Sequence, residues 1–255
     1  MLGRSVRYFR FVLAALLALP AIGALAAPSA SEIVEHYETT IWGKTLRAVF
    51  EMTLVTPSWS RTLTMNVTMD RPTKSFVRIT APAKDTGILS LRVGSDMWNY
   101  MPAIERVVKI PPSMMSQPWL GSDFSNDDMV KEGSLVTDYT HRMVGERMEG
   151  AAAVYEVELL PKPGAAVVWG KINMIASKDN LLPLKVRFFN ERNEAVRTLT
   201  YTELRKMGGR VIPTRWEMQP ADQPGKSTTL VVKSAEYDRP VPADTFSMQN
   251  LGRRR

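Results

Sequence analysis

The sequence has 255 residues, of which 44% are hydrophobic, 23% are charged and none is cysteine. A chain of this length can bury a sizeable core, and the lack of cysteine excludes disulfide bonds, thiolate metal sites and a lipid anchor on a cysteine side chain. The formal net charge of +7 overstates the basic character, because three arginines lie near each terminus and the other basic residues are dispersed among acids. A nucleic-acid-binding function is therefore not supported, since it requires a dense basic face.

The first 26 residues have the pattern of a secretory signal peptide. Three arginines precede an apolar run over residues 11–19, and the small residues Ala24 and Ala26 form a cleavage site. The apolar run is too short for a membrane span, which needs about 20 residues. We expect cleavage after Ala26, a periplasmic location in a Gram-negative cell, and one domain over residues 27–255 that ends in the short basic tail Arg253–Arg255.

A short amphipathic helix is predicted near the start of the mature chain, over residues 29–40. Ile33, Val34 and Tyr37 recur there at helical spacing behind Ser31. This apolar stripe must pack against another apolar surface, and the predicted sheet provides one.

Alternation of apolar and polar residues predicts β-strands over most of the remaining chain. The segments 46–54 and 63–69 each present apolar side chains on one face, and Pro57-Ser58 forms the turn between them. Further strands are assigned to residues 76–79, 88–93, 97–101, 104–110, 154–160, 171–176, 182–189, 196–204, 211–218 and 228–234. Residues 145–150 are interpreted as a connection. We therefore predict a mainly β fold with one strongly curved antiparallel sheet, an incomplete β-barrel of about 11 strands, and short helices that cover its concave apolar face.

The central stretch, residues 96–129, concentrates aromatic and methionine side chains between prolines. Two short strands, 97–101 and 104–110, are expected to form a hairpin, and Pro111-Pro112 then ends the pairing because proline cannot donate to a sheet. Ser125 is a candidate N-cap for a helical turn whose first residues include two aspartates, where acids suit the helix dipole. The simplest interpretation is a loop that covers one end of the sheet.

A cavity is predicted on the concave side of the sheet. Only the first helix and the central stretch can fill that side, and an under-filled barrel interior is a cavity. Methionines are abundant at strand positions expected to face it, and a thioether side chain adapts to apolar partners of different shapes. These methionines are Met52, Met65, Met69, Met174 and Met218. The alternative, methionines that fill gaps in a closed core, stays open.

No catalytic or metal-binding motif is present in the sequence. Neither His36 nor His141 lies in a zinc motif, and the nucleophile-elbow, phosphate-loop and dinucleotide patterns are missing. Ser122 is a weak candidate nucleophile because nothing in the sequence indicates its base. Three acids could form an acid–base pair or bind a hard cation, although turn and helix-capping roles are favoured. These acids are Asp123, Asp127 and Asp128.

The central stretch resembles a segment of the periplasmic outer-membrane lipoprotein-sorting proteins, the LolA-like superfamily. In that family a Trp-x-Tyr-x-Pro hairpin is followed by Arg, a basic residue, Ile-Pro, and then Gly-Ser-Asp-Phe with acids. The matching residues here are Trp98, Tyr100, Pro102, Arg106, Lys109, Ile110, Pro111, Gly121, Ser122, Asp123, Phe124, Asp127 and Asp128. The signal peptide, the first helix and the many strands extend the resemblance over the mature chain, whereas Trp119, Met114 and Met115 replace a more polar stretch.

The resemblance implies a carrier without enzyme activity, whose concave apolar face shelters acyl chains across the aqueous periplasm. Keeping a ~16-carbon chain from water is worth roughly 12 kcal/mol, which the carrier must match and yet release. The residues assigned to the cavity or its lid are Phe50, Met52, Met65, Met69, Trp98, Tyr100, Met101, Met114, Met115, Trp119 and Phe124. Arg106 and Lys109 are candidate contacts for a lipid headgroup.

The partners implied by the resemblance are an acylated lipoprotein or lipid, and an inner-membrane exporter of the RND type or a lipoprotein-releasing complex. A monomer without nucleic-acid or cofactor binding is expected. Two alternatives stay open. The fold resembles sensors that regulate through a protein partner, although such sensors usually add a second domain and this sequence ends soon after Phe246. A hydrolase would need a carboxylate pair in a cleft, for which Asp123 is the candidate.

Overall fold

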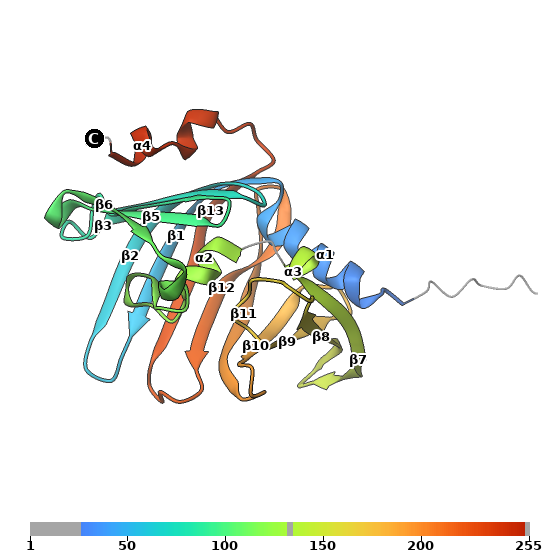
Figure 1. The fold of residues 1–255 in the computed structure, drawn as a ribbon. Helices are drawn as coiled ribbons and strands as arrows, with labels where there is room; N and C mark the ends of the chain where they lie inside the picture. Colours follow the sequence, from blue (N-terminus) through green and yellow to red (C-terminus); the bar gives the residue numbers. More distant parts are fainter. Residues whose placement is uncertain (1–26, 132–134, 253–255) are drawn as a thin grey trace, which may run out of the picture.

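The computed structural model describes residues 27–131 and 135–252. The predicted signal peptide, residues 1–26, and the basic tail, residues 253–255, lie outside the described residues. One antiparallel sheet of 13 strands dominates the fold, in the order β6-β5-β4-β3-β2-β1-β13-β12-β11-β10-β9-β8-β7. The sheet curls around α1 (Ala30–Trp42), α2 (Asn126–Lys131) and α3 (Leu135–Asp138), and its end strands β6 and β7 do not pair, so it is not closed into a barrel (Figure 1).

The strands are 5 to 13 residues long. They are β1 (Thr45–Val55), β2 (Ser60–Asp70), β3 (Lys74–Ala81), β4 (Leu89–Val93), β5 (Asp96–Met101), β6 (Arg106–Ile110), β7 (Tyr139–Glu149), β8 (Ala152–Pro161), β9 (Lys171–Ser177), β10 (Pro183–Phe189), β11 (Ala195–Met207), β12 (Arg210–Pro220) and β13 (Ser227–Tyr237). The long connection between β6 and β7 contains η2 (Pro112–Met114), η3 (Trp119–Gly121), α2 and α3. Strand β13 returns beside β1 and so joins the two halves of the sheet. The mainly β fold and its single curved antiparallel sheet are confirmed.

The strand count of about 11 was too low, mainly because β7 was missed. Most of the predicted connection at residues 145–150 is part of β7, which ends at Glu149. The strand continues through Gly145, with a register shift against β8 between Met143 and Gly145. In β7, the last strand of the sheet, only Tyr139 is buried, and the other side chains are half-buried or exposed. Apolar and polar residues therefore do not alternate clearly in it, and the glycine suggested a turn.

Helix α1 begins with a capping box at Ser29, the first residue of the predicted range 29–40. The Ser29 hydroxyl accepts a hydrogen bond from the Glu32 amide at 3.2 Å, and the Glu32 carboxylate accepts one from the Ser29 amide at 2.7 Å. These bonds satisfy two amides that have no partner inside the helix. The helix ends at Gly43, whose amide donates to the Thr39 carbonyl.

Replacing Ser29 by alanine is expected to lower the free energy of unfolding by about 1 kcal/mol, because it removes the helix N-cap. The midpoint of urea unfolding would fall at an unchanged slope. Ser58, exposed in the β1–β2 turn, provides the matched control, and its replacement by alanine should change the stability by no more than about 0.5 kcal/mol. Equal effects of the two substitutions would contradict the capping role.

Two apolar clusters lie on opposite faces of the sheet. The large core occupies the concave face, against α1 and the segment that follows β6. A smaller cluster lies on the convex face, where the C-terminal segment with η4 (Ala243–Phe246) and α4 (Met248–Gly252) packs on β3 and β4 (Figure 1). It consists of Phe76, Leu89, Leu91, Phe246 and Leu251, with Trp98, Tyr100 and Val241 packed against it. The C-terminal segment thus covers apolar surface that the end of the sheet would otherwise expose.

Candidate functional site

An apolar cavity of about 130 Å³ lies between the concave face of the sheet and the segment that covers it. Its wall combines aromatic rings with methionine and leucine side chains from both halves of the sheet. The lining residues are Tyr37, Trp42, Phe50, Met52, Met65, Val67, Trp119, Phe124, Asp127, Asp128, Met129, Leu135, Tyr139, Trp169, Ile172, Phe188, Leu199, Tyr201, Trp216, Met218 and Leu230. Only two of them are charged, and both belong to α2.

We call residues 111–131, which cover the cavity, the lid. The lid contains η2 (Pro112–Met114), η3 (Trp119–Gly121) and α2. Trp119 is only 1% exposed, and its indole Nε1 donates to the Ser90 hydroxyl of β4 at 3.2 Å. Pro111 follows directly after β6, so the predicted end of strand pairing at the two prolines is confirmed. The lid therefore inserts a buried aromatic side chain into the space that the sheet encloses.

The predicted helical turn after Ser125 is also present. The Ser125 amide donates to the Asp128 carboxylate at 2.6 Å, and the Asp128 amide donates to the Ser125 hydroxyl at 3.2 Å. This reciprocal pair is a capping box for α2. It fixes the conformation in which Asp127 and Asp128 lie at the cavity.

Polar contacts hold the lid to β11 and β13. The Asp123 amide donates to the Thr228 hydroxyl at 2.9 Å, and that hydroxyl donates to the Asp123 carboxylate at 2.7 Å. The same carboxylate pairs with Lys226 at 3.1 Å. Arg197 donates to the Asp123 carbonyl at 2.8 Å and forms an ion pair with Asp128. Asp123 and Asp128 thus have anchoring and capping roles, and the described residues contain no group of three His, Cys, Asp or Glu side chains that could hold a metal ion.

The deepest wall of the cavity is aromatic. The Trp216 ring lies edge-on to Trp42 and Phe50, with centroid separations of 5.3 and 5.6 Å, and its Nε1 donates to the Pro213 carbonyl. A second hydrogen bond, of 2.9 Å, joins the hydroxyls of Tyr37 and Tyr201. The polar atoms of three of these rings are therefore satisfied, and the ring surfaces that remain present apolar area to the cavity.

Tyr139 completes this wall as a neutral phenol. Burial raises its pKa above the usual range, and the nearby carboxylates of Asp127, Asp138 and Asp128 raise it further. The ring is 2% exposed and lines the cavity. No charge develops on this side chain at physiological pH, which keeps that part of the wall apolar.

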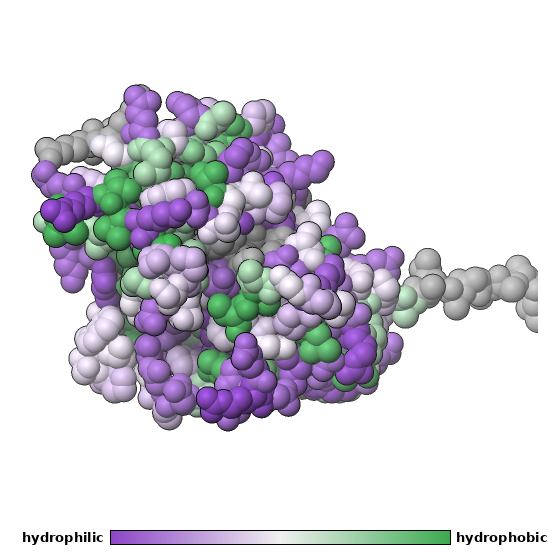
Figure 2. Space-filling model, viewed as in Figure 1, coloured by the Kyte–Doolittle hydropathy of each residue, from purple (hydrophilic) through white to green (hydrophobic). Residues whose placement is uncertain are grey.

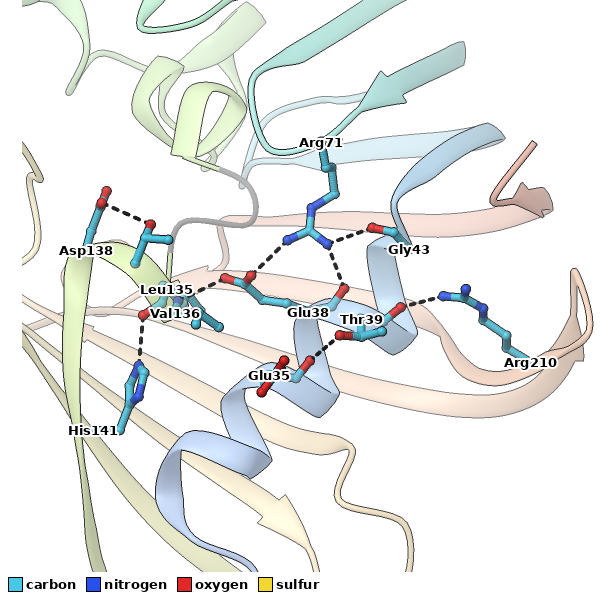
Figure 3. Close-up of polar contacts among 11 residues, drawn as sticks. Glu35, Glu38, Thr39, Gly43, Arg71, Leu135, Val136, Asp138, His141 and Arg210 are labelled. Atoms are coloured by element: carbon cyan, nitrogen blue, oxygen red, sulfur yellow. Dashed lines mark hydrogen bonds and ion pairs between the residues drawn. The ribbon is translucent and has the colours of Figure 1, made fainter. Parts of the chain in front are cut away.

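A buried ion pair lies where α1 meets α3. Arg71 contacts the Glu38 carboxylate at 2.8 Å and donates to the Gly43 carbonyl, while the second Glu38 oxygen accepts from the Val136 amide at 3.3 Å (Figure 3). His141 bonds the Leu135 carbonyl at 2.9 Å. Burial raises the pKa of Glu38, and Arg71 opposes that rise. Glu38 therefore connects α1, α3 and the β2–β3 turn through one carboxylate.

The structure brings five of the predicted cavity residues to the cavity. Phe50, Met52, Met65, Trp119 and Phe124 line it. Three further predicted residues face the concave core without lining the cavity: Met69 is fully buried there, and Met101 and Met115 pack against it. Met114 is 45% exposed.

Two predicted lid residues lie on the opposite side of the sheet. Trp98 and Tyr100 alternate with Met97 and Met101 along β5, and they pack against the convex cluster under the C-terminal segment. Their predicted position at the cavity mouth is therefore not the one observed. Because side chains alternate between faces, the β5 methionines and the β5 rings cannot share one side of the sheet.

The two candidate headgroup contacts also lie away from the cavity. Lys109 pairs with Asp96 at 3.0 Å and lies over the Trp98 ring, while Arg106 is exposed on the edge strand β6. Apolar atoms gather at the β5–β6 end of the molecule (Figure 2). Exposed hydrophobic residues in this region are Ile104, Val107, Val108 and Met114.

Sequence reasoning missed most of the aromatic wall. Tyr37, Trp42, Trp169 and Trp216 line the cavity but were not assigned to it. Trp216 lies two residues before Met218, which was expected to face inward, so the period of β12 could have identified it as a residue of the same face. Trp169 lies in the loop before β9, where side chains do not alternate between two faces, so no sequence pattern indicates that it lines the cavity.

The candidate nucleophile and the two histidines have structural partners. The Ser122 hydroxyl is buried and donates to the Trp119 carbonyl at 2.7 Å. His36 and Thr40 are within hydrogen-bond distance on α1, and His141 bonds Ser31 as well as Leu135. In the described ranges no helix is long and apolar enough to cross a membrane.

Comparison with known proteins gives one family match. A protein-family model described as an uncharacterized protein matches residues 71–253. No curated protein matches the sequence.

Three solved structures share the fold over nearly their whole length. A putative outer membrane lipoprotein-sorting protein domain from Vibrio parahaemolyticus is 22% identical, with 88% of this chain and 98% of that chain covered and a TM-score of 0.76. A DUF1329 family protein from Desulfovibrio piger is 20% identical, with 87% and 97% covered and a TM-score of 0.78. A LolA superfamily protein from Nitrosomonas europaea is 21% identical, with 88% and 100% covered and a TM-score of 0.76. The chain therefore belongs to the family of uncharacterized proteins whose model matches residues 71–253, and it shares the fold of these solved structures, one of which is a LolA superfamily protein.

Proposed function

We propose that this protein is a periplasmic carrier that holds an acyl chain of a lipoprotein or lipid in the cavity and moves it toward the outer membrane. The observation that carries the proposal is an apolar cavity lined by rings and methionines on the concave face of a sheet that does not close. We infer that an inner-membrane complex, of the RND exporter or lipoprotein-releasing type, loads the carrier. No catalytic step is part of this function.

The size of the cavity indicates that ligand binding requires the lid to move. An engineered apolar cavity of about 150 Å³ accommodates a benzene molecule. The cavity of about 130 Å³ therefore has room for only a short part of a ~16-carbon chain. Trp119 and Phe124 occupy apolar space that the rest of the chain would need, and lifting the lid would free it.

The lid also explains how strong burial can be combined with release. Each buried methylene is worth about 0.8 kcal/mol, so a fully sheltered chain would be held very tightly in a permanently open groove. In this protein the ligand must replace the contacts of Trp119 and Phe124. The net free energy of binding is therefore the difference between the contacts that the ligand gains and those that the two rings lose. When the ligand leaves, the two rings return and cover the same apolar surface.

The proposal is tested by native mass spectrometry of the exported protein, followed by titration with N-phenyl-1-naphthylamine, a neutral fluorescent apolar probe. We expect a co-purified acyl compound and saturable probe binding that a lipopeptide or phospholipid displaces. The Leu230→Glu variant places a charge at the cavity and should lose binding, because an ionised carboxylate is costly in apolar surroundings.

The Leu204→Glu variant is the matched control. Leu204 is 51% exposed on β11, so the same chemical change there should leave probe binding unaltered. A protein that binds no probe, no lipopeptide and no phospholipid would refute the carrier function. Equal loss of binding in the two variants would show that the cavity is not the site.

A further inference from the structure

Arg197 of β11 is a buried cation beside the cavity. The residue is only 5% exposed, and its guanidinium carbon lies 4.2 Å from the Trp169 centroid and 4.6 Å from the Phe188 centroid, beside a pair of rings whose centroids are 5.3 Å apart. Both rings line the cavity. Contact with the two rings helps to position the guanidinium and compensates in part for its lost hydration.

Both hydrogen-bond acceptors that the described residues provide for Arg197 belong to the lid. One terminal nitrogen donates to the Asp123 carbonyl and the other pairs with the Asp128 carboxylate. Its Nε is buried and has no hydrogen-bond partner among the residues that the structure describes. Because a buried unpaired donor is costly, the site has capacity for one more acceptor than the lid provides.

Charges at this place are divided between the lid and the sheet. The lid contributes the acids Asp123, Asp127 and Asp128, whereas the sheet side contributes the cations Arg197 and Lys226. In the closed form the two sides neutralise each other through the pairs Arg197–Asp128 and Lys226–Asp123. A lid that lifts removes the acids and leaves two cations beside an open apolar groove.

We propose that Arg197 binds the anionic group of the carried molecule, a lipid phosphate or carboxylate, in the position that the Asp128 carboxylate occupies in the closed form. This inference rests on the proposed carrier function and narrows its ligand to an acyl chain with an anionic headgroup. The planar guanidinium can donate two hydrogen bonds to the two oxygens of a carboxylate or phosphate. Because the ligand anion replaces the Asp128 carboxylate, the buried cation keeps a countercharge when the lid lifts. Lys226 lies on the same side and attracts the same charge.

The experiment measures how tightly anionic and neutral amphiphiles of equal chain length bind to the exported protein, from their displacement of N-phenyl-1-naphthylamine. Palmitate provides a carboxylate, palmitoyl lysophosphatidate provides a phosphate, and hexadecanol and monopalmitin are the neutral counterparts. We expect the anions to bind about 10-fold more tightly than the neutral compounds. Comparison of the two anions distinguishes a fatty-acid ligand from a phospholipid-like ligand.

Three variants separate the headgroup contact from the fold. Arg197→Gln should remove the preference for anions, read as the ratio of palmitate to hexadecanol affinity, because the loss of a lid contact affects both ligands alike. Asp128→Asn removes the internal competitor and should strengthen anion binding more than hexadecanol binding, a difference that a looser lid alone does not produce. Arg142→Gln, at an exposed pair with Glu158, is the matched control and should behave as the wild type.

The outcomes distinguish this inference from the carrier function. Equal affinity of the wild type for palmitate and hexadecanol would overturn the headgroup role while the carrier function stands. The headgroup role is also overturned if Asp128→Asn does not strengthen anion binding more than hexadecanol binding, or if Arg197→Gln weakens both ligand classes alike. Failure of every amphiphile to displace the probe would overturn both proposals.

Discussion

A disulfide bond between positions 123 and 228 is expected to abolish uptake of acyl ligands, and its reduction should restore uptake. The Asp123 amide and the Thr228 hydroxyl are 2.9 Å apart, so cysteines at the two positions are close enough to link the lid to β13. The protein contains no cysteine, so the double variant can form only this one bond. A lid fixed to the sheet keeps Trp119 and Phe124 in the space that the ligand needs.

The measurement is probe and lipopeptide binding to the Asp123→Cys, Thr228→Cys double variant, before and after reduction by dithiothreitol. The reduced variant carries the same substitutions and serves as its own reference. A second control places the bond within the sheet, at the cross-strand pair Thr53 and Thr62, whose hydroxyls are 3.0 Å apart on β1 and β2. Oxidation there should leave binding unchanged. Full uptake by the oxidised 123–228 variant would show that the lid need not move.

The general fold could be predicted from the alternation of polar and apolar residues, because one face of each such strand is exposed to solvent and the other is buried. Strands β1 and β2 show this pattern over their whole length, and their observed burial alternates as predicted. The capping box at Ser125 could be foreseen because it depends on residues three positions apart. In both cases short-range chemistry determined the structure.

The site was harder to predict because two features depend on long-range packing. In β5 both faces are apolar, with Met97 and Met101 on one side and Trp98 and Tyr100 on the other, so alternation does not indicate which face meets the cavity. The choice is made by the C-terminal segment, more than 100 residues later, which covers the rings. Nothing local to β5 carries that information.

The contact between Arg197 and the lid shows the same limit. Arg197 is the second residue of the predicted strand 196–204, and a charged residue there would normally be solvated. Its partners Asp123 and Asp128 are about 70 residues away in sequence. The sequence indicated correctly that the acids suit turns and caps. It did not indicate that a buried arginine would join them to the opposite wall.

Replacing Arg71 by alanine is expected to have the largest effect on stability, a loss of about 3–5 kcal/mol in the free energy of unfolding. The Arg71 and Glu38 side chains are 11% and 7% exposed, so the substitution leaves a buried carboxylate without its countercharge. It also removes the donor to the Glu38 and Gly43 carbonyls at the end of α1. Urea unfolding measures the change, and Arg142→Ala, at the exposed pair with Glu158, should cost no more than about 1 kcal/mol.

The pH dependence of this loss identifies its cause. Burial already raises the pKa of Glu38 while Arg71 opposes the rise, so the pKa in the Arg71→Ala variant should lie higher still. A carboxyl whose pKa is raised on folding favours the folded state at low pH and disfavours it as the pH rises through the folded-state value. The deficit of Arg71→Ala relative to the wild type should therefore shrink as the pH is lowered from 7 toward 5, and adding Glu38→Gln should recover part of it at pH 7. A deficit that is the same at both pH values would assign the loss to the missing carbonyl contacts rather than to the unpaired charge.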